Sequence, residues 1–329
     1  MVRRVGIGFN PHLPIRETVD FAQHAERTGY DSFWMHETYF QRDAISYLAA
    51  AAMVTERIRL GLGCINVFTR NAALIAMTAG AIDELSGERF ILGIGMGGLL
   101  PMTKLGYKVV PSDGGRPIVT MSETIEAVRR LSTGEPVTMH GEFIDFDGVK
   151  LVFPPRQRRL PIYIATTRPR LVQLAKNIAD GVILPGVATT IEGLKDQLDS
   201  VKRGSPLPAD FEIADYLMCS VGTNRSDALD CVRQQGFLLD IIARSSQEQY
   251  MERYGVMPEE TQKLREAWQR GDRQAASAAL SDAMISAFTI SGTPEECLSK
   301  FEEYRKTGIT LPIIMPIGDI KLAIETFSA

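Results

Sequence analysis

Short apolar runs rich in branched residues alternate with segments of helical spacing, at a period of about thirty residues, from the start of this chain. Strands are expected at 5–9, 32–37, 59–66 and 89–96. Helices are expected between them at 15–28, 43–54 and 71–85. Apolar strands joined by crossover helices are typical of a parallel sheet that is covered on both faces.

This alternation is interrupted twice and then continues to the last residues. A loop-like stretch at 99–115 and a helix at 122–131 precede the segment 137–153, whose alternating pattern predicts an antiparallel hairpin. Further strands are expected at 161–165, 181–184, 211–221 and 310–315. Further helices are expected at 169–179, at 190–202, from about 226, from 292 to 306 and at the end of the chain. The segment 237–288 has a helical pattern throughout.

Eight strands in this order predict an α/β protein with a (β/α)8 barrel, the TIM-barrel fold. A length of 329 residues is sufficient for such a barrel with insertions. Because no linker or low-complexity stretch is present, we expect a single domain over residues 1–329 with insertions at about 99–155 and 237–288. The second insertion is expected to be a solvent-facing lid, a subunit contact or a wall of the substrate pocket.

Composition limits the partners. A formal net charge of −4 disfavours a general nucleic-acid or membrane-surface binder. The four cysteines are widely spaced and the chain has only four histidines, so neither a disulfide framework nor a metal site is expected. With no signal-like segment and no apolar run of membrane-spanning length, the chain is expected to be soluble and cytoplasmic.

Special residues follow three successive early strands, and such residues meet at the carboxyl end of a barrel. The run Gly95-Met96-Gly97-Gly98 is either a glycine edge against a flat ring or phosphate, or an ordinary tight turn. Glu37 is placed either to move a proton or to form a salt bridge or helix cap. Cys64 has no histidine in a context that would activate it, so a ligand-facing bulge is favoured over a nucleophile.

The strand expected at 161–165 leads into Thr166-Thr167-Arg168-Pro169 at the start of a helix. Hydroxyl groups, a guanidinium and free N–H groups make an anion site, although an ordinary capped helix with surface arginines has the same composition. A turn of this kind is a candidate site for a small anion.

The chain resembles the luciferase-like superfamily of flavin and deazaflavin barrels. Within that superfamily it is similar to the methylene-tetrahydromethanopterin reductase family, which uses coenzyme F420. The resemblance extends over the whole chain and is carried by the residues at 34–39, 59–66, 83–95, 141–145, 161–165, 179–182 and 288–295.

The resemblance implies a deazaflavin that lies flat at the carboxyl-end mouth of the barrel. Glu37 matches the acidic position near the reactive side of the ring, and a non-prolyl cis peptide is implied at Cys64–Ile65. The implied cofactor-binding residues are Thr38, Gly63, Cys64, Ile65, Asn66, Gly95, Met96, Gly97, Ala165, Thr166, Thr167 and Arg168. A homodimer is also implied.

Three positions depart from the pattern of the superfamily. Thr38 stands where many members have histidine, Gly98 where some have a second carboxylate, and Arg168 where glycine is frequent. The resemblance therefore implies F420-dependent hydride transfer on a small organic substrate, with a methylene-tetrahydropterin or folate as the family-based candidate. The alternatives are an FMN-dependent luciferase-like monooxygenase and a barrel that binds a cofactor without catalysis.

Overall fold

The computed structural model describes residues 4–97, 105–106, 116–184, 189–244 and 247–328. The chain divides into two compact units. The larger unit comprises Gly8–Pro185 and Val201–Ala214, and the smaller unit comprises Met1–Ile7, Gly186–Ser200 and Asp215–Ala329. Two strands, β1 (Gly6–Phe9) and β9 (Glu212–Val221), cross the boundary between the units along the chain.

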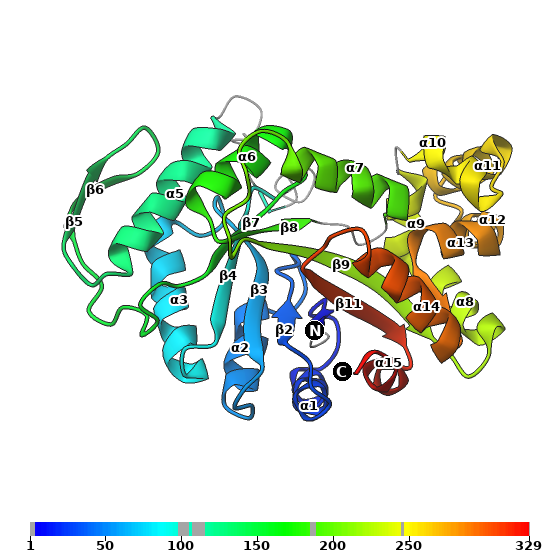
Figure 1. Cartoon of the computed structure of the whole chain (residues 1–329), viewed down its shortest axis with the longest axis horizontal. Coiled ribbons are helices and arrows are strands. Elements are labelled where there is room, and N and C mark those ends of the chain that lie inside the picture. The colour runs from blue at the N-terminus through cyan, green and yellow to red at the C-terminus, as the bar shows by residue number, and fades with distance from the viewer. Residues whose placement is uncertain (1–3, 98–104, 107–115, 185–188, 245–246, 329) are drawn as a thin grey trace. The chain divides into compact units, whose positions relative to one another are not determined.

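The larger unit contains parallel strands in the order β2-β3-β4-β7-β8 (Figure 1). They are β2 (Ser32–Met35), β3 (Arg59–Asn66), β4 (Phe90–Gly95), β7 (Ile162–Ala165) and β8 (Gly181–Leu184). Its helices are α1 (Ile15–Arg27), α2 (Ala44–Ala52), α3 (Ala72–Ser86), α5 (Pro117–Leu131) and α6 (Pro169–Ile178). The predicted hairpin is confirmed as the antiparallel pair β5 (Val137–His140) and β6 (Asp145–Val149).

The smaller unit contains the strand order β10-β9-β11, with β10 (Ile290–Gly292) parallel to β9 and β11 (Leu311–Gly318) on its other side. Its helices are α7 (Ile191–Lys202), α8 (Arg225–Arg233), α9 (Gly236–Ala243), α10 (Glu248–Met251), α11 (Pro258–Gln269), α12 (Arg273–Ala279), α13 (Asp282–Phe288), α14 (Pro294–Arg305) and α15 (Ile320–Phe327), with a 3-10 turn at Glu252–Tyr254. The prediction that 237–288 is helical is confirmed.

Local chemistry explains where the elements begin. The carboxylate of Asp43 accepts the Ser46 N–H at 2.8 Å and so caps α2, as predicted, and the Asn71 side chain caps α3 in the same way. Gly87, with φ of +64°, ends α3. Every residue of β2 and β4 is buried, as expected for a parallel sheet that is covered on both faces.

Each strand of the predicted barrel is followed along the chain by at least one helix, as the alternating pattern predicts. In the described part of the chain, no helix combines the length and hydropathy that crossing a bilayer requires.

Candidate active site

The Glu37 carboxyl group lies just beyond the carboxyl end of β2, with its side chain 17 % exposed. Its Oε2 accepts the backbone N–H of Asn66 at 3.2 Å, and its Oε1 lies 3.6 Å from Arg70 Nε. Burial raises the pKa of Glu37, and the Asn66 amide and the Arg70 charge only partly oppose that effect. The group is therefore prepared to hold a proton at a higher pH than an exposed glutamate.

The end of β3 forms the bulge that the sequence predicts, with a shift of register against β4 between Leu62 and Ile65. A non-prolyl cis peptide is present, but it joins Gly63 to Cys64. The prediction of a cis bond at Cys64–Ile65 is therefore wrong by one residue. Neither bond involves proline, so the residue types at 63–65 carry no signal that distinguishes them.

Cys64 lies against β4. A Cβ atom added to Gly95 would lie 2.5 Å from Cys64 Sγ, so the thiol occupies the space where a side chain at 95 would be. Burial raises the pKa of the Cys64 thiol to about 12, and the charge of Glu37 adds to the shift. A thiol this weakly acidic is a poor nucleophile, which supports the sequence interpretation of this position as a bulge.

Asn66 connects three segments at this end of the sheet. Its Nδ2 donates to Tyr39 Oη at 2.7 Å, and its Oδ1 accepts the Phe68 N–H at 2.8 Å. Gly97 has φ of +66°, and an added Cβ there would lie 2.2 Å from Asn66 Nδ2. Glycine is therefore required at 97 by both conformation and space.

Sequence reasoning did not assign Tyr39 or Arg70 to the site. Tyr39 was visible as the last residue of the motif at 34–39, and Arg70 precedes the Asn71 helix cap. His36, which follows β2 directly, is neutral at physiological pH because burial lowers its pKa to about 4. Its backbone N–H donates to Phe9 O at 3.1 Å, which fits a structural role.

The end of β7 adjoins the end of β4, since Gly95 pairs with Ala165 in the sheet register. Thr166 is buried, and its Oγ1 accepts the Arg168 N–H at 3.0 Å. Thr167 and Arg168 are exposed, and α6 begins directly after them with Pro169 in its first turn. The turn therefore presents a hydroxyl and a guanidinium to solvent at the start of a helix.

The predicted site residues thus lie at neighbouring strand ends of one sheet, because Asn66 pairs with Gly95 and Gly95 with Ala165. The side chains of Ile65 and Met96 are buried, so these two residues offer a ligand mainly their backbone. Thr38 is half-buried between Glu37 and Tyr39. Gly98 lies outside the described residues.

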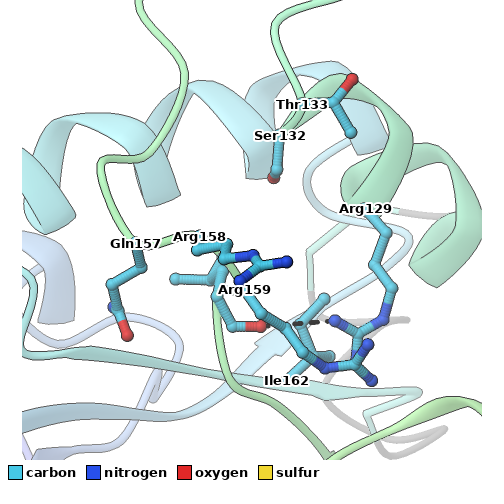
Figure 2. Close-up of a pocket in the computed structure, with 8 residues that line it drawn as sticks. Arg129, Ser132, Thr133, Gln157, Arg158, Arg159 and Ile162 are labelled. Carbon is cyan, nitrogen blue, oxygen red and sulfur yellow. Dashed lines mark hydrogen bonds between the residues drawn. The ribbon is translucent and has the colours of Figure 1, made fainter.

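A cavity of about 510 Å³ lies at the opposite end of β7 (Figure 2). Arg129 in this cavity donates to Ile178 O at 3.1 Å and to Asp180 at 2.7 Å, and Arg159 donates to the same carboxylate at 2.8 Å. These arginines hold β7 and α5 together at the amino end of the strand. Because barrel enzymes work at the carboxyl end, this cavity is not the candidate active site. Within the described residues, no group of three or more histidine, cysteine, aspartate or glutamate side chains is arranged to hold a metal.

Comparison with known proteins agrees with this geometry. The family model described as luciferase-like monooxygenase matches residues 4–311. The 5,10-methylenetetrahydromethanopterin reductase of Methanolobus tindarius is 32 % identical over 96 % of this chain and 95 % of its own length. The reductase of the same name from Archaeoglobus fulgidus is also 32 % identical, over 97 % and 95 %.

The solved structure of the coenzyme F420 dependent tetrahydromethanopterin reductase from Methanopyrus kandleri matches with a TM-score of 0.87 at 23 % identity, covering 99 % of this chain and 97 % of that one. This likeness shows the fold, and it confirms the predicted (β/α)8 barrel of luciferase-like type.

Proposed function

Because this chain belongs to the luciferase-like monooxygenase family, we propose from its relatives and its site that it is an F420-dependent oxidoreductase. It transfers a hydride between the deazaflavin and a small organic substrate. The observation that carries the catalytic part of the proposal is the partly buried Glu37 carboxyl group, held by the Asn66 amide at the strand ends.

The residues at the strand ends fit a planar cofactor. Gly95 and Ala165 pair side by side, and Gly97 lies two residues after Gly95, so none of these three positions carries a side chain larger than a methyl group. Thr167 and Arg168 are exposed at the start of α6, where a phosphate is favoured by the guanidinium and by the helix N-terminus. These features support the assignment of the residues at 63–66, 95–97 and 165–168 to cofactor binding.

The cofactor, when bound, provides the hydride chemistry. The protein orients substrate and ring and controls the proton. Asn66 N–H donates to Oε2 of Glu37, and Oε1 of Glu37 faces Arg70. Because burial raises its pKa, Glu37 is better suited than an exposed glutamate to donate a proton to a substrate nitrogen or oxygen as charge develops there.

We propose a methylene-tetrahydropterin or methylene-tetrahydrofolate as the substrate, in one-carbon metabolism. The two relatives at 32 % identity, both named methylenetetrahydromethanopterin reductase, support this substrate class. We also propose that residues 1–329 work as one domain, with the hairpin region and the helical segment 237–288 as insertions. A cytoplasmic location is consistent with the free thiols of all four cysteines.

The test is anaerobic mixing of reduced F420 with methylene-tetrahydromethanopterin or methylene-tetrahydrofolate, followed by the absorbance of oxidised F420. Turnover with at least one of them is expected. The variant Glu37→Gln is expected to lower kcat by about a hundredfold with the Kd of F420 unchanged. Glu17→Gln, on the exposed face of α1, is the matched control. If neither redox form of F420 binds the wild-type protein, the proposed function is wrong.

We further propose a homodimer that forms through the outer face of α3. Leu74, Met77 and Leu85 lie on this face and are 45 %, 56 % and 44 % exposed. The helix carries no charge between Ala72 and Ile82, so two copies of the face can meet without burying a charge. Met77→Glu is expected to halve the mass measured by analytical ultracentrifugation. A wild-type monomer at micromolar concentration would contradict this part of the proposal.

A further inference from the structure

A cavity of about 430 Å³ lies between the segment that follows β3 and the tip of the hairpin formed by β5 and β6. Residues 67, 68 and 71–73 form one of its walls, and residues 143–146 form the other. Its volume is within the range of small-molecule sites. None of the residues that line it belongs to the positions assigned above to the cofactor or to proton transfer.

The first wall adjoins the candidate active site through the main chain. It begins at Val67, the residue after Asn66, whose N–H donates to Glu37 Oε2 at 3.2 Å. The N–H of Phe68, the next residue of the wall, donates to Asn66 Oδ1 at 2.8 Å. This wall of the cavity is therefore built on the same residue that orients the Glu37 carboxyl group.

The second wall is anchored by one carboxylate. Glu123 of α5 accepts the N–H groups of residues 142, 143 and 144 at 2.8, 2.8 and 2.9 Å. A Cβ atom added to Gly141 would collide with this carboxylate, so the close approach requires glycine. Burial acts to raise the pKa of Glu123, but the three hydrogen bonds lower it overall, which keeps the carboxylate charged at neutral pH. Because the donors belong to the main chain, a change of the Phe143 side chain leaves this anchor in place.

Aromatic side chains from the two walls meet in the cavity. The rings of Phe68 and Phe143 have centroids 6.0 Å apart and are perpendicular, which is an edge-to-face arrangement that aromatic pairs favour. Phe146 is a third aromatic residue of the lining. Phe143 is 46 % exposed although its backbone is anchored, so its ring is available to a ligand.

The polar residues of the lining are already engaged by neighbours. Asn71 Oδ1 accepts the N–H that caps α3, and Asp145 Oδ1 lies 2.6 Å from His140 Nδ1. Among the described residues that line the cavity, none is a lysine or an arginine. The cavity therefore suits a neutral aromatic ring better than an anionic group.

We propose that this cavity binds the aryl ring of the substrate. The inference rests on the proposed function, because it concerns the methylene-tetrahydropterin class. In these substrates the reacting methylene carbon bridges two nitrogen atoms, and one of these nitrogens bears an aryl ring. The ring is thus attached two bonds from the carbon that exchanges the hydride, so it has to lie close to the reaction site. The phenylalanines of the cavity provide an aromatic surface beside the residue that orients Glu37.

The cavity then contributes to the choice of substrate. A tetrahydropterin without the aryl ring gains nothing from Phe68, Phe143 or Phe146, whereas the ring of a complete substrate contacts them. One aromatic contact changes affinity by about two- to tenfold. With more than one such contact, a compound that bears the ring is expected to bind at least about tenfold more tightly than one that lacks it.

The test compares the Kd of tetrahydrofolate, which bears the aryl ring, with that of 6-methyltetrahydropterin, which lacks it, by anaerobic calorimetry on the full chain. Wild-type protein is expected to prefer tetrahydrofolate at least about tenfold. Because tetrahydrofolate also carries a glutamate, the variant Phe143→Ala isolates the contribution of the ring. It is expected to weaken tetrahydrofolate about three- to tenfold and to leave the Kd of 6-methyltetrahydropterin unchanged.

Two further variants serve as controls. Phe143→Tyr keeps the aromatic ring and is expected to keep the wild-type preference. Phe237→Ala, which removes a phenylalanine that is 50 % exposed on α9, is the matched control and is expected to bind both compounds as the wild type does. Thermal melting checks that each variant is folded.

Equal Kd values for the two compounds in the wild-type protein would overturn the inference and leave the proposed function intact. So would equal weakening of both compounds in the folded Phe143→Ala variant. If Phe143→Ala halves the mass measured by analytical ultracentrifugation and leaves the Kd of tetrahydrofolate unchanged, the cavity is a contact between two copies of the chain and the inference is wrong. Failure of both redox forms of F420 to bind the wild-type protein would overturn the proposed function and, with it, this inference.

Discussion

Replacing Arg70 by glutamine is expected to shift the pH dependence of the reaction. Arg70 Nε lies 3.6 Å from Glu37 Oε1, and its side chain is 31 % exposed. Coulomb's law at this separation gives about 1 kcal/mol in water and about 5 kcal/mol at an effective dielectric constant of about 20. Because Arg70 also pairs with Asp43 at 3.1 Å and is partly solvated, a value of about 1–2 kcal/mol applies.

Without the positive charge of Arg70, the effect by which burial raises the pKa of Glu37 is less opposed. The protonated form of Glu37 therefore becomes more favourable by about 1–2 kcal/mol, or about five- to thirtyfold in proton affinity. If Glu37 acts as the acid, activity falls as the pH rises through its pKa. In Arg70→Gln this fall is expected at higher pH than in the wild-type enzyme.

The assay is kcat/KM against pH for anaerobic hydride transfer, with saturating F420. Arg27→Gln, an exposed arginine at the end of α1, is the matched control and is expected to keep the wild-type profile. The variants Glu37→Gln and Glu37→Gln/Arg70→Gln are both expected to lack the fall. A profile for Arg70→Gln that is unchanged or moved to lower pH would refute the proposed role of Glu37.

Three further substitutions or reagents test the site and the scaffold. Gly97→Ala is expected to weaken F420 binding at least about tenfold, because φ is +66° and the new methyl would lie 2.2 Å from Asn66 Nδ2; fluorescence titration measures this, and an unchanged Kd would contradict it. Asp180→Asn is expected to reduce the free energy of unfolding by about 2–3 kcal/mol in urea melts at neutral pH, since Arg129 and Arg159 lose the charged carboxylate that they share. Burial acts to raise the pKa of Asp180, but hydrogen bonds from Arg129 and its other partners lower it overall, so this difference from wild type should shrink as the pH falls through the lowered pKa. The Cys64 thiol, with a pKa raised to about 12 by burial, is expected to resist iodoacetamide at neutral pH, and Cys64→Ala should keep hydride transfer within about threefold of wild type.

The strands of the barrel could be predicted closely because they are apolar on both faces. The strand expected at 89–96 is observed at Phe90–Gly95, and the strand expected at 211–221 at Glu212–Val221. The helical character of 237–288 was also readable from its spacing. Its division into short helices was not predicted, although two of the breaks lie at Gly255 and Gly271, where the backbone has positive φ values that favour glycine.

The candidate site was predictable as a set of strand ends but not as a set of contacts. Glu37 and Asn66 are separated by 29 residues, and their hydrogen bond exists only because β2 and β3 pair in one register. The ion pair of Arg70 with Glu37 depends on the same pairing and left no pattern in the sequence. The location of the cis bond at Gly63–Cys64 likewise depends on the bulge as a whole and not on the identity of one residue.

The amide that holds Glu37 belongs to the main chain of residue 66, while the Asn66 side chain is engaged with Tyr39 and Phe68. The hydrogen bond that orients Oε2 of Glu37 therefore does not depend on which side chain residue 66 carries. Directed evolution toward new substrates can randomise side chains outside the proposed cofactor positions while the Glu37 carboxyl group keeps its position. A library built this way would vary substrate preference without displacing the Glu37 carboxyl group.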